Sequence, residues 1–186
     1  RVTPATLIPR PETELLVEKA LARIPPDARW NIADLGTGSG AIALAIAHER
    51  PRCRVYACDH SVAALDVARA NAAQLDITNI EFFHGDWLTP LTRRTFEMIV
   101  SNPPYVRADD PHLNNGDVRF EPRAALVGGP DGLDAIRLIA KQAFTRLMPG
   151  GFLFLEHGHD QAAAVAETLT AAGFCEILHH RDLAGH

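Results

Sequence analysis

Hydrophobic and polar positions along this chain alternate between two periods, and the alternation predicts an α/β fold. Short, nearly continuous apolar runs are typical of buried strands, and apolar residues spaced three and four apart are typical of helices. Strands that alternate with helices indicate a doubly wound, mostly parallel sheet with helices on both faces. The apolar runs predict strands at 32–35, 55–58, 81–84, 97–101, 152–156 and 174–180. The helical spacing predicts helices at 11–24, from the glycine-rich turn to about 48, from 61 to about 72, at 132–147 and at 162–172.

Prolines, glycines and one long polar segment mark where these elements end. Pro11 suits the first position of a helix, and Pro25-Pro26 ends that helix. Pro149-Gly150-Gly151 is expected to separate a helix from the strand that follows. Residues 106–130 are polar, proline-rich and without period. A loop of that length inside a compact domain is usually functional or disordered.

Composition indicates one ordinary globular domain. The 186 residues are 47% apolar and 22% charged, which is enough for a proper core. No run is long enough to span a bilayer, and the N-terminus lacks the charged and apolar regions of a signal peptide. The net charge of −5 argues mildly against nucleic-acid binding, which usually needs a basic surface. Cys53, Cys58 and Cys175 lack metal-type spacing, so we expect reduced thiols in a cytosolic protein.

A glycine-rich turn follows the first predicted strand and opens an alanine-rich helix. Such a turn presents backbone N–H groups and a helix N-terminus to a ligand, and glycines let the ligand approach the backbone. The second strand closes on Asp59, which suits either ribose hydroxyls or the capping of a helix. The spacing Gly36-x-Gly38-x-x-Ala41 also fits the loose dinucleotide fingerprint, so an NAD-dependent oxidoreductase stays open at this point. The turn consists of Gly36, Thr37, Gly38, Ser39 and Gly40.

A third element of the same kind follows the strand predicted at 81–84. Gly85-Asp86-Trp87 brings a carboxylate and an aromatic ring to the place where an adenine ring would lie. The alternatives are that Asp86 is a turn residue and that Trp87 belongs to the core. His157-Gly158-His159 resembles a metal-binding pair, but no Cys or carboxylate cluster accompanies it, so no metal is expected.

The tetrapeptide Asn102-Pro103-Pro104-Tyr105 is the most specific chemical feature of the chain. It follows a buried strand, and its two prolines hold the backbone extended and remove N–H donors. Outward carbonyls and the Asn102 amide then suit a planar –NH2 group, with Tyr105 packed beside it. The alternative is a strand that simply ends in a turn.

In this order, the glycine turn, Asp59, Gly85-Asp86 and the tetrapeptide resemble the class I S-adenosylmethionine-dependent methyltransferases. The tetrapeptide resembles that of the amino-methyltransferases, and the flanking blocks resemble those of the release factor glutamine methyltransferases. These blocks are residues 7–14, 110–113, 116–122 and 155–158. The resemblance covers almost the whole chain and implies a cytoplasmic enzyme that methylates the Gln of the Gly-Gly-Gln loop in peptide chain release factors.

The resemblance also implies roles for individual residues. Asn102, Pro103 and Tyr105 would be catalytic, and Pro104, Arg10 and Glu121 would join them in binding the substrate. S-adenosylmethionine, and its product S-adenosylhomocysteine, would be bound by the glycine turn with Asp59, Asp86, Trp87 and Asn102. The alternatives for two of these are that Arg10 is a solvated surface charge and that Glu121 forms a plain salt bridge with Arg119.

The resemblance further implies a seven-stranded type of Rossmann-like sheet. We expect one catalytic domain over 1–186, with a lead-in segment and helix at 1–28 and the core at 29–186. The family carries a small helical domain before this stretch and a final strand after residues 182–186, so both ends are expected to be cut relative to it.

Other functions remain open from the residues themselves. A methyltransferase acting on a ribosomal-protein glutamine, or on adenine or cytosine in nucleic acid, would use the same tetrapeptide. A nucleic-acid enzyme would need a basic recognition region, which this stretch lacks. An NAD-dependent oxidoreductase would leave residues 102–105 without a function. A non-catalytic binding module would not explain why every position expected to carry chemistry is occupied by a suitable residue.

Overall fold

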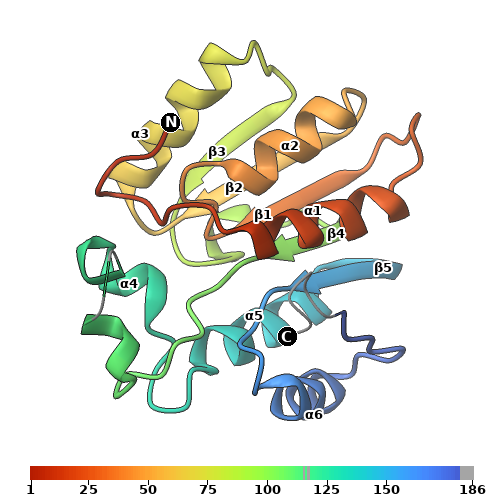
Figure 1. Ribbon diagram of the computed structural model, residues 1–186. Coiled ribbons are helices and arrows are strands. Elements are labelled where there is room, and N and C mark those ends of the chain that lie inside the picture. The colour runs from red at the N-terminus through yellow and green to blue at the C-terminus, as the bar shows by residue number, and fades with distance from the viewer. Residues whose placement is uncertain (115, 117, 181–186) are drawn as a thin grey trace.

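A five-stranded parallel sheet forms the centre of the molecule in a computed structural model, which describes residues 1–114, 116 and 118–180 (Figure 1). The strands follow the order β3-β2-β1-β4-β5. The chain moves outward from β1 to β3 and then returns to place β4 beside β1, which creates a switch point between those two strands. The strands are β1 Asn31–Leu35, β2 Arg54–Asp59, β3 Ile80–His84, β4 Phe96–Ser101 and β5 Leu147–Leu155.

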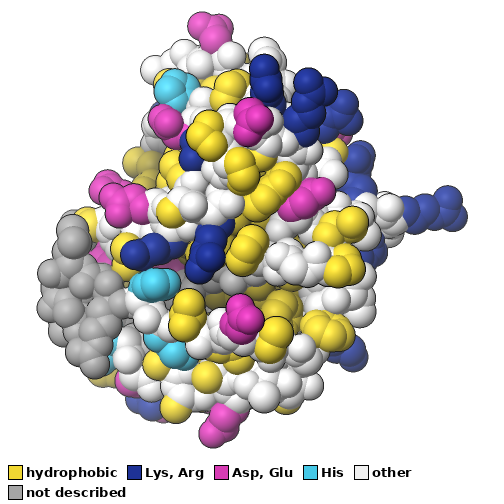
Figure 2. Space-filling view, turned by 90° about the vertical axis from the view of Figure 1, so that its right-hand side faces the viewer, with side chains coloured by type: hydrophobic (Ala, Val, Ile, Leu, Met, Phe, Trp, Pro, Cys, Tyr) yellow, Lys and Arg dark blue, Asp and Glu magenta, His cyan; other side chains and the backbone are white. Residues whose placement is uncertain are grey.

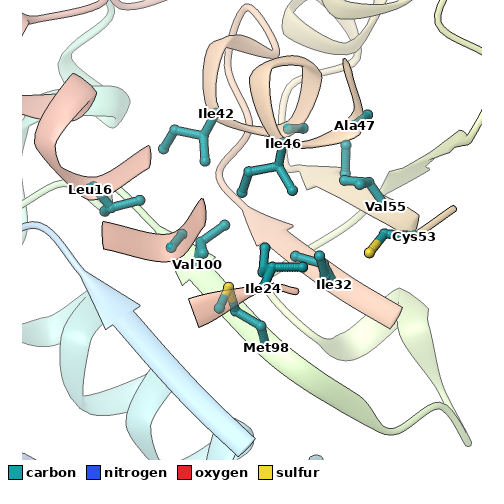
Figure 3. Packing of buried hydrophobic residues seen from close by; sticks show 13 residues of the cluster. Leu16, Ile24, Ile32, Ile42, Ile46, Ala47, Cys53, Val55, Met98 and Val100 are labelled. Atoms are coloured by element: carbon teal, nitrogen blue, oxygen red, sulfur yellow. The ribbon is translucent and has the colours of Figure 1, made fainter. Parts of the chain in front are cut away.

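Helices cover both faces of this sheet, as the alternating pattern predicts. Alternate residues of one strand point to opposite faces, so Ile32 packs under α1 and α2 while Ala33 packs under α5. Figure 3 shows the first of these layers, in which Ile42 and Ile46 of α2 belong to one buried cluster with Met98 and Val100 of β4. The helices are α1 Pro11–Arg23, α2 Ala41–Glu49, α3 Val62–Gln74, α4 Arg123–Leu126, α5 Asp134–Phe144 and α6 Ala162–Ala172.

The long polar segment after β4 is folded against the domain. It contains two short 3-10 turns, Pro111–Asn114 and Val118–Phe120, and the single turn of α4. Val106 and Val127 form an isolated bridge that brings the two ends of the segment together. The flanking block that includes Asp117, and the residues 182–186 before the expected final strand, lie outside the described residues.

Two predicted boundaries are wrong, each for a local reason. α5 ends at Phe144, before the Pro149-Gly150-Gly151 turn that was expected to end it, and β5 already begins at Leu147. The register between β4 and β5 shifts after Phe96, and this irregularity accommodates the Pro-Gly-Gly residues inside the strand.

The strand predicted at 174–180 is not formed. Phe174 donates its N–H to Leu169 at the end of α6, and its ring packs against Phe144 at 5.6 Å between centroids. Glu176 has a φ of 55°, which interrupts an extended run. A short apolar run cannot form a strand without a hydrogen-bonding neighbour, and no described strand pairs with these residues.

The edge of the sheet from which the strands begin faces the viewer in Figure 2, where Lys and Arg side chains lie among Asp and Glu side chains.

No helix in the described part of the chain is long and apolar enough to cross a membrane. Among residues 1–114, 116 and 118–180, no group of three or more His, Cys, Asp or Glu side chains is placed to hold a metal ion.

Candidate active site

A cavity of about 670 Å³ lies at the carboxyl ends of the strands. Ligands of open α/β sheets bind at this edge, at the switch point between strands such as β1 and β4. The walls come from the lead-in segment, the glycine turn, the ends of β2, β3 and β4, and the long segment after β4. One continuous space therefore connects the predicted cofactor residues with the tetrapeptide.

The glycine turn has the backbone that only glycine adopts easily. Gly36, Gly38 and Gly40 have φ values of 71°, 57° and 85°. A Cβ on Gly38 would meet no atom within 4 Å, so this position is open toward the cavity, whereas one on Gly40 would lie 3.0 Å from the Leu44 side chain. The turn thus leaves room for a ligand on one side and packs against helices on the other.

Asp34, which the sequence did not single out, holds this turn from below. Its Oδ2 accepts hydrogen bonds from Thr37 Oγ1 at 2.7 Å and from the Ala43 N–H at 3.1 Å, which ties the turn to the first turn of α2. Oδ1 is buried without a hydrogen-bond partner. Burial raises the pKa of Asp34 to about 7, and nearby Asp59 adds to the rise, while the bonds from Thr37 and Ala43 oppose it.

The other predicted cofactor residues surround the turn. Asp59 accepts the Gly38 N–H at 2.8 Å through Oδ2 and the Ser61 N–H at 2.8 Å through Oδ1, so its carboxylate also shapes the backbone. Asp86 is exposed at the rim and lies 2.9 Å from His60 Nδ1. Trp87 is half-buried, and its ring lies beside Gly36. All of these residues line the cavity.

The tetrapeptide leaves β4 with its acceptors free. Ser101 anchors the strand end by donating its hydroxyl to the Leu35 carbonyl at 2.6 Å. Asn102 lines the cavity and donates through Nδ2 to Thr13 Oγ1 at 3.1 Å. Its Oδ1 and the Pro103 carbonyl accept no hydrogen bond from any described residue. Two unpaired acceptors therefore lie at the switch point.

Tyr105 is not among the residues that line the cavity. Its ring packs against the cluster around Leu133, and its hydroxyl donates to Glu156 Oε1 at 3.0 Å. Burial and adjacent Glu156 raise the pKa of Tyr105 above its usual range, so the phenol keeps its proton. The tyrosine thus supports the site from behind, and its contact with a substrate remains a prediction.

Glu156 and Thr13 complete a polar cluster behind Asn102. Glu156 follows β5, which pairs with β4 so that Leu155 lies opposite Ser101 and the next residues are Glu156 and Asn102. Thr13, in the first turn of α1, donates its hydroxyl to Glu156 Oε2 at 2.8 Å. Burial raises the pKa of Glu156 and nearby Glu12 adds to the rise, while hydrogen bonding from Thr13, Tyr105 and Asn102 opposes it. The sequence placed Glu156 in a flanking block but gave no sign of this cluster.

Arg10 and Glu121 form an ion pair that joins the lead-in segment to the long segment. Arg10 Nη2 lies 2.8 Å and 2.9 Å from the two Glu121 carboxylate oxygens, and the Glu121 side chain is only 4% exposed. Among the described residues Glu121 pairs with Arg10 and not with Arg119, whose guanidinium lies over the Phe120 ring. Their part in substrate binding remains a prediction.

The cavity therefore gathers most of the predicted site. Gly36, Thr37, Gly38, Ser39, Asp59, Asp86, Trp87, Asn102 and Pro104 contribute to its walls. Five predicted residues are not among those that line it: Gly40, Pro103, Tyr105, Arg10 and Glu121.

Comparison with known proteins agrees with this arrangement. Residues 11–118 match the family described as "Methyltransferase small domain". The chain is 53% identical to a release factor glutamine methyltransferase of Xylella fastidiosa, over 98% of this chain and 66% of that protein. It is 52% identical to one of Neisseria gonorrhoeae, over 99% of this chain and 67% of that protein.

The fold recurs in solved structures at lower identity. A ribosomal protein L11 methylase from Lactobacillus delbrueckii superposes with a TM-score of 0.71 at 21% identity, covering 98% of this chain and 79% of that one. The chain spans about two thirds of the length of the curated relatives it matches. With the family match over most of the domain and half-identical relatives along its whole length, the chain belongs to the methyltransferase small domain family and, within it, to the release factor glutamine methyltransferases.

Proposed function

We propose that this chain carries the catalytic domain of an enzyme that transfers a methyl group from S-adenosylmethionine to the side-chain amide nitrogen of a glutamine. The glutamine is the one in the Gly-Gly-Gln loop of peptide chain release factors, in the cytoplasm. Family membership supports the reaction class, since the relatives are named release factor glutamine methyltransferases. The chemistry of the cavity supports the kind of nucleophile.

The cofactor half of the cavity fits S-adenosylmethionine. The space above Gly38 is open, and a side chain at this position would project into it. The Asp59 carboxylate suits ribose hydroxyls, and Trp87 with Asp86 suits an adenine ring and its amino group. The bound cofactor supplies an electrophilic methyl group on a sulfonium. The chain's own residues then have to deliver and orient the nitrogen that attacks it.

An amide nitrogen is a poor nucleophile because its lone pair is delocalised into the carbonyl. Asn102 Oδ1 and the Pro103 carbonyl would accept its two N–H bonds and fix its direction. These hydrogen bonds strengthen as positive charge develops on nitrogen, so they stabilise the transition state more than the ground state. No strong base is needed, because the methylated nitrogen loses its proton once charge has developed.

The observation that carries this proposal is the pair of unpaired acceptors at the switch point. The Asn102 amide lines the cavity, and neither its Oδ1 nor the Pro103 carbonyl has a donor among the described residues. An –NH2 group has two hydrogens to give and matches two acceptors. A hydride-transferring enzyme would have no use for them.

The test offers labelled S-adenosylmethionine with three acceptors: release factor, the same factor with its loop Gln changed to Ala, and duplex DNA. We expect label only on the unchanged factor. Label on DNA would favour the nucleobase alternative, and undiminished label on the Gln-less factor would contradict the substrate assignment. A ribosomal-protein glutamine is the remaining alternative, since it would present the same amide to the tetrapeptide, and purified ribosomal protein serves as a fourth acceptor.

A further inference from the structure

We propose that Thr13 and Glu156 are positioning residues that fix which end of the Asn102 amide faces the substrate. The inference rests on the proposed function and concerns atoms behind the catalytic tetrapeptide. An Asn side chain has an acceptor oxygen and a donor nitrogen of almost equal size. Only one of its two orientations leaves Oδ1 free to accept from a substrate –NH2 group.

Counting protons along the cluster determines that orientation. An ionised carboxylate only accepts hydrogen bonds, so Glu156 takes the single hydroxyl proton of Thr13 at 2.8 Å. With its proton committed, the Thr13 oxygen can only accept from its other neighbour. That neighbour is Asn102, 3.1 Å away, so the atom facing Thr13 must be the nitrogen.

The remaining groups around Glu156 point the same way. Tyr105, held protonated, donates to the other carboxylate oxygen at 3.0 Å. The Asn102 side chain also belongs to the groups whose hydrogen bonding favours the ionised carboxylate. A carboxylate surrounded by donors repels the Asn102 oxygen and attracts its nitrogen. Oδ1 is thereby directed to the opposite side, where it has no partner within the described residues.

Burial gives this arrangement its strength. Thr13 is 7% exposed, so water cannot replace its hydroxyl cheaply. The three residues come from three elements: α1, the end of β4 and the end of β5. The packing of α1 against the sheet therefore affects the direction of Asn102 Oδ1, because Thr13 of α1 holds the amide nitrogen of Asn102.

The test uses two matched pairs of variants in the methylation of release factor. Glu156→Gln introduces a donor into the cluster, and Glu14→Gln removes an equal charge from the exposed side of the same region. Thr13→Val removes the hydroxyl, and Thr13→Ser restores it. We expect kcat to fall about ten- to a hundredfold in Glu156→Gln and Thr13→Val, with KM for release factor within about threefold, because a misoriented contact costs about that much.

Glu14→Gln and Thr13→Ser should stay within about twofold of wild type, and all four variants should bind S-adenosylhomocysteine as wild type does. A Glu156→Gln variant with the kcat of Glu14→Gln would overturn the inference. So would a loss confined to cofactor affinity and thermal midpoint, which would indicate a purely structural role. Failure of the proposed function appears differently, as an inactive wild-type protein with this substrate.

Discussion

Two carboxylates, one buried and one half-buried, lie at the same edge of the sheet and have different bonding partners. Asp34 at the end of β1 and Glu156 after β5 each accept a threonine hydroxyl, from Thr37 and Thr13. Burial raises the pKa of both. Asp34 Oδ2 also accepts a backbone N–H, and Asp34 Oδ1 has no hydrogen-bond partner. In Glu156, by contrast, each carboxylate oxygen accepts a hydrogen bond from a side chain.

This difference in hydrogen-bond partners distinguishes the half of the cavity proposed to bind the cofactor from the half proposed to bind the amide. A carboxylate bonded to the backbone fixes the path of the glycine turn, so we expect Asp34 to affect cofactor binding. A carboxylate bonded to side chains fixes rotamers and proton positions, so we expect Glu156 to affect the half of the cavity proposed to bind the amide.

The largest expected effect is on the pH dependence of stability. The pKa of Asp34 is raised to about 7, so the folded chain keeps this proton when the unfolded chain has already lost it above about pH 4. Its contribution to the free energy of unfolding is therefore fully present below pH 4 and is lost as pH rises through 7. At about 1.4 kcal/mol per pKa unit, the loss amounts to roughly 4 kcal/mol at most.

Asp34→Asn keeps an oxygen for Thr37 and Ala43 and places an amide where the proton would be. We expect its free energy of unfolding in urea to decline less between pH 5 and 8 than that of wild type. Other titrating groups, such as Glu156 and His179, remain the same in both proteins, so the difference isolates Asp34. Equal slopes for the two proteins would show that Asp34 is ionised throughout.

A smaller effect is expected on cofactor binding. Asp59→Ala removes the acceptor for the Gly38 and Ser61 N–H groups as well as the proposed ribose contact. Affinity for S-adenosylhomocysteine should weaken by roughly 1.5–3 kcal/mol, the cost of losing a hydrogen bond to a charged group. Calorimetry is the measurement, and tight NAD binding by the wild type would contradict the cofactor assignment.

The smallest effect concerns the helix next to Asp59. Ser61 caps α3 by accepting the Ala64 N–H at 3.2 Å. Ser61→Ala should lower the free energy of unfolding by about 1 kcal/mol and leave methyl transfer at saturating cofactor unchanged. A large loss of activity would mean that this turn takes part in the chemistry.

Local patterns predicted the cavity well because its parts are short segments. The glycine turn and the tetrapeptide each follow a strand and Asp59 ends one, and parallel strands bring their carboxyl ends to one edge. The cluster behind Asn102 was not predictable, since Thr13 and Asn102 are 89 residues apart and Thr13 and Glu156 are 143 apart. Such pairs depend on how α1 crosses the sheet.

Two further errors have the same origin. The short apolar run at 174–180 is typical of a strand, but such a run does not reveal whether a neighbour is available to pair with it. Asp34 lies within the strand predicted at 32–35 and was not singled out, because only its complete burial reveals a carboxylate under the glycine turn. The division into a lead-in at 1–28 and a core at 29–186 stays a prediction.

The separation of the two halves of the cavity is tested most directly by single-turnover methyl transfer at saturating cofactor, with release factor as the acceptor. The proteins to compare are wild type, Asp59→Ala and Asn102→Ala. Asn102→Ala should lose about 10²–10³ in rate, because it removes an acceptor used in the transition state, and should keep most of its affinity for S-adenosylhomocysteine. Asp59→Ala, once saturated, should transfer methyl within about threefold of the wild-type rate. A wild-type rate in Asn102→Ala, or an equal loss in both variants, would contradict the account.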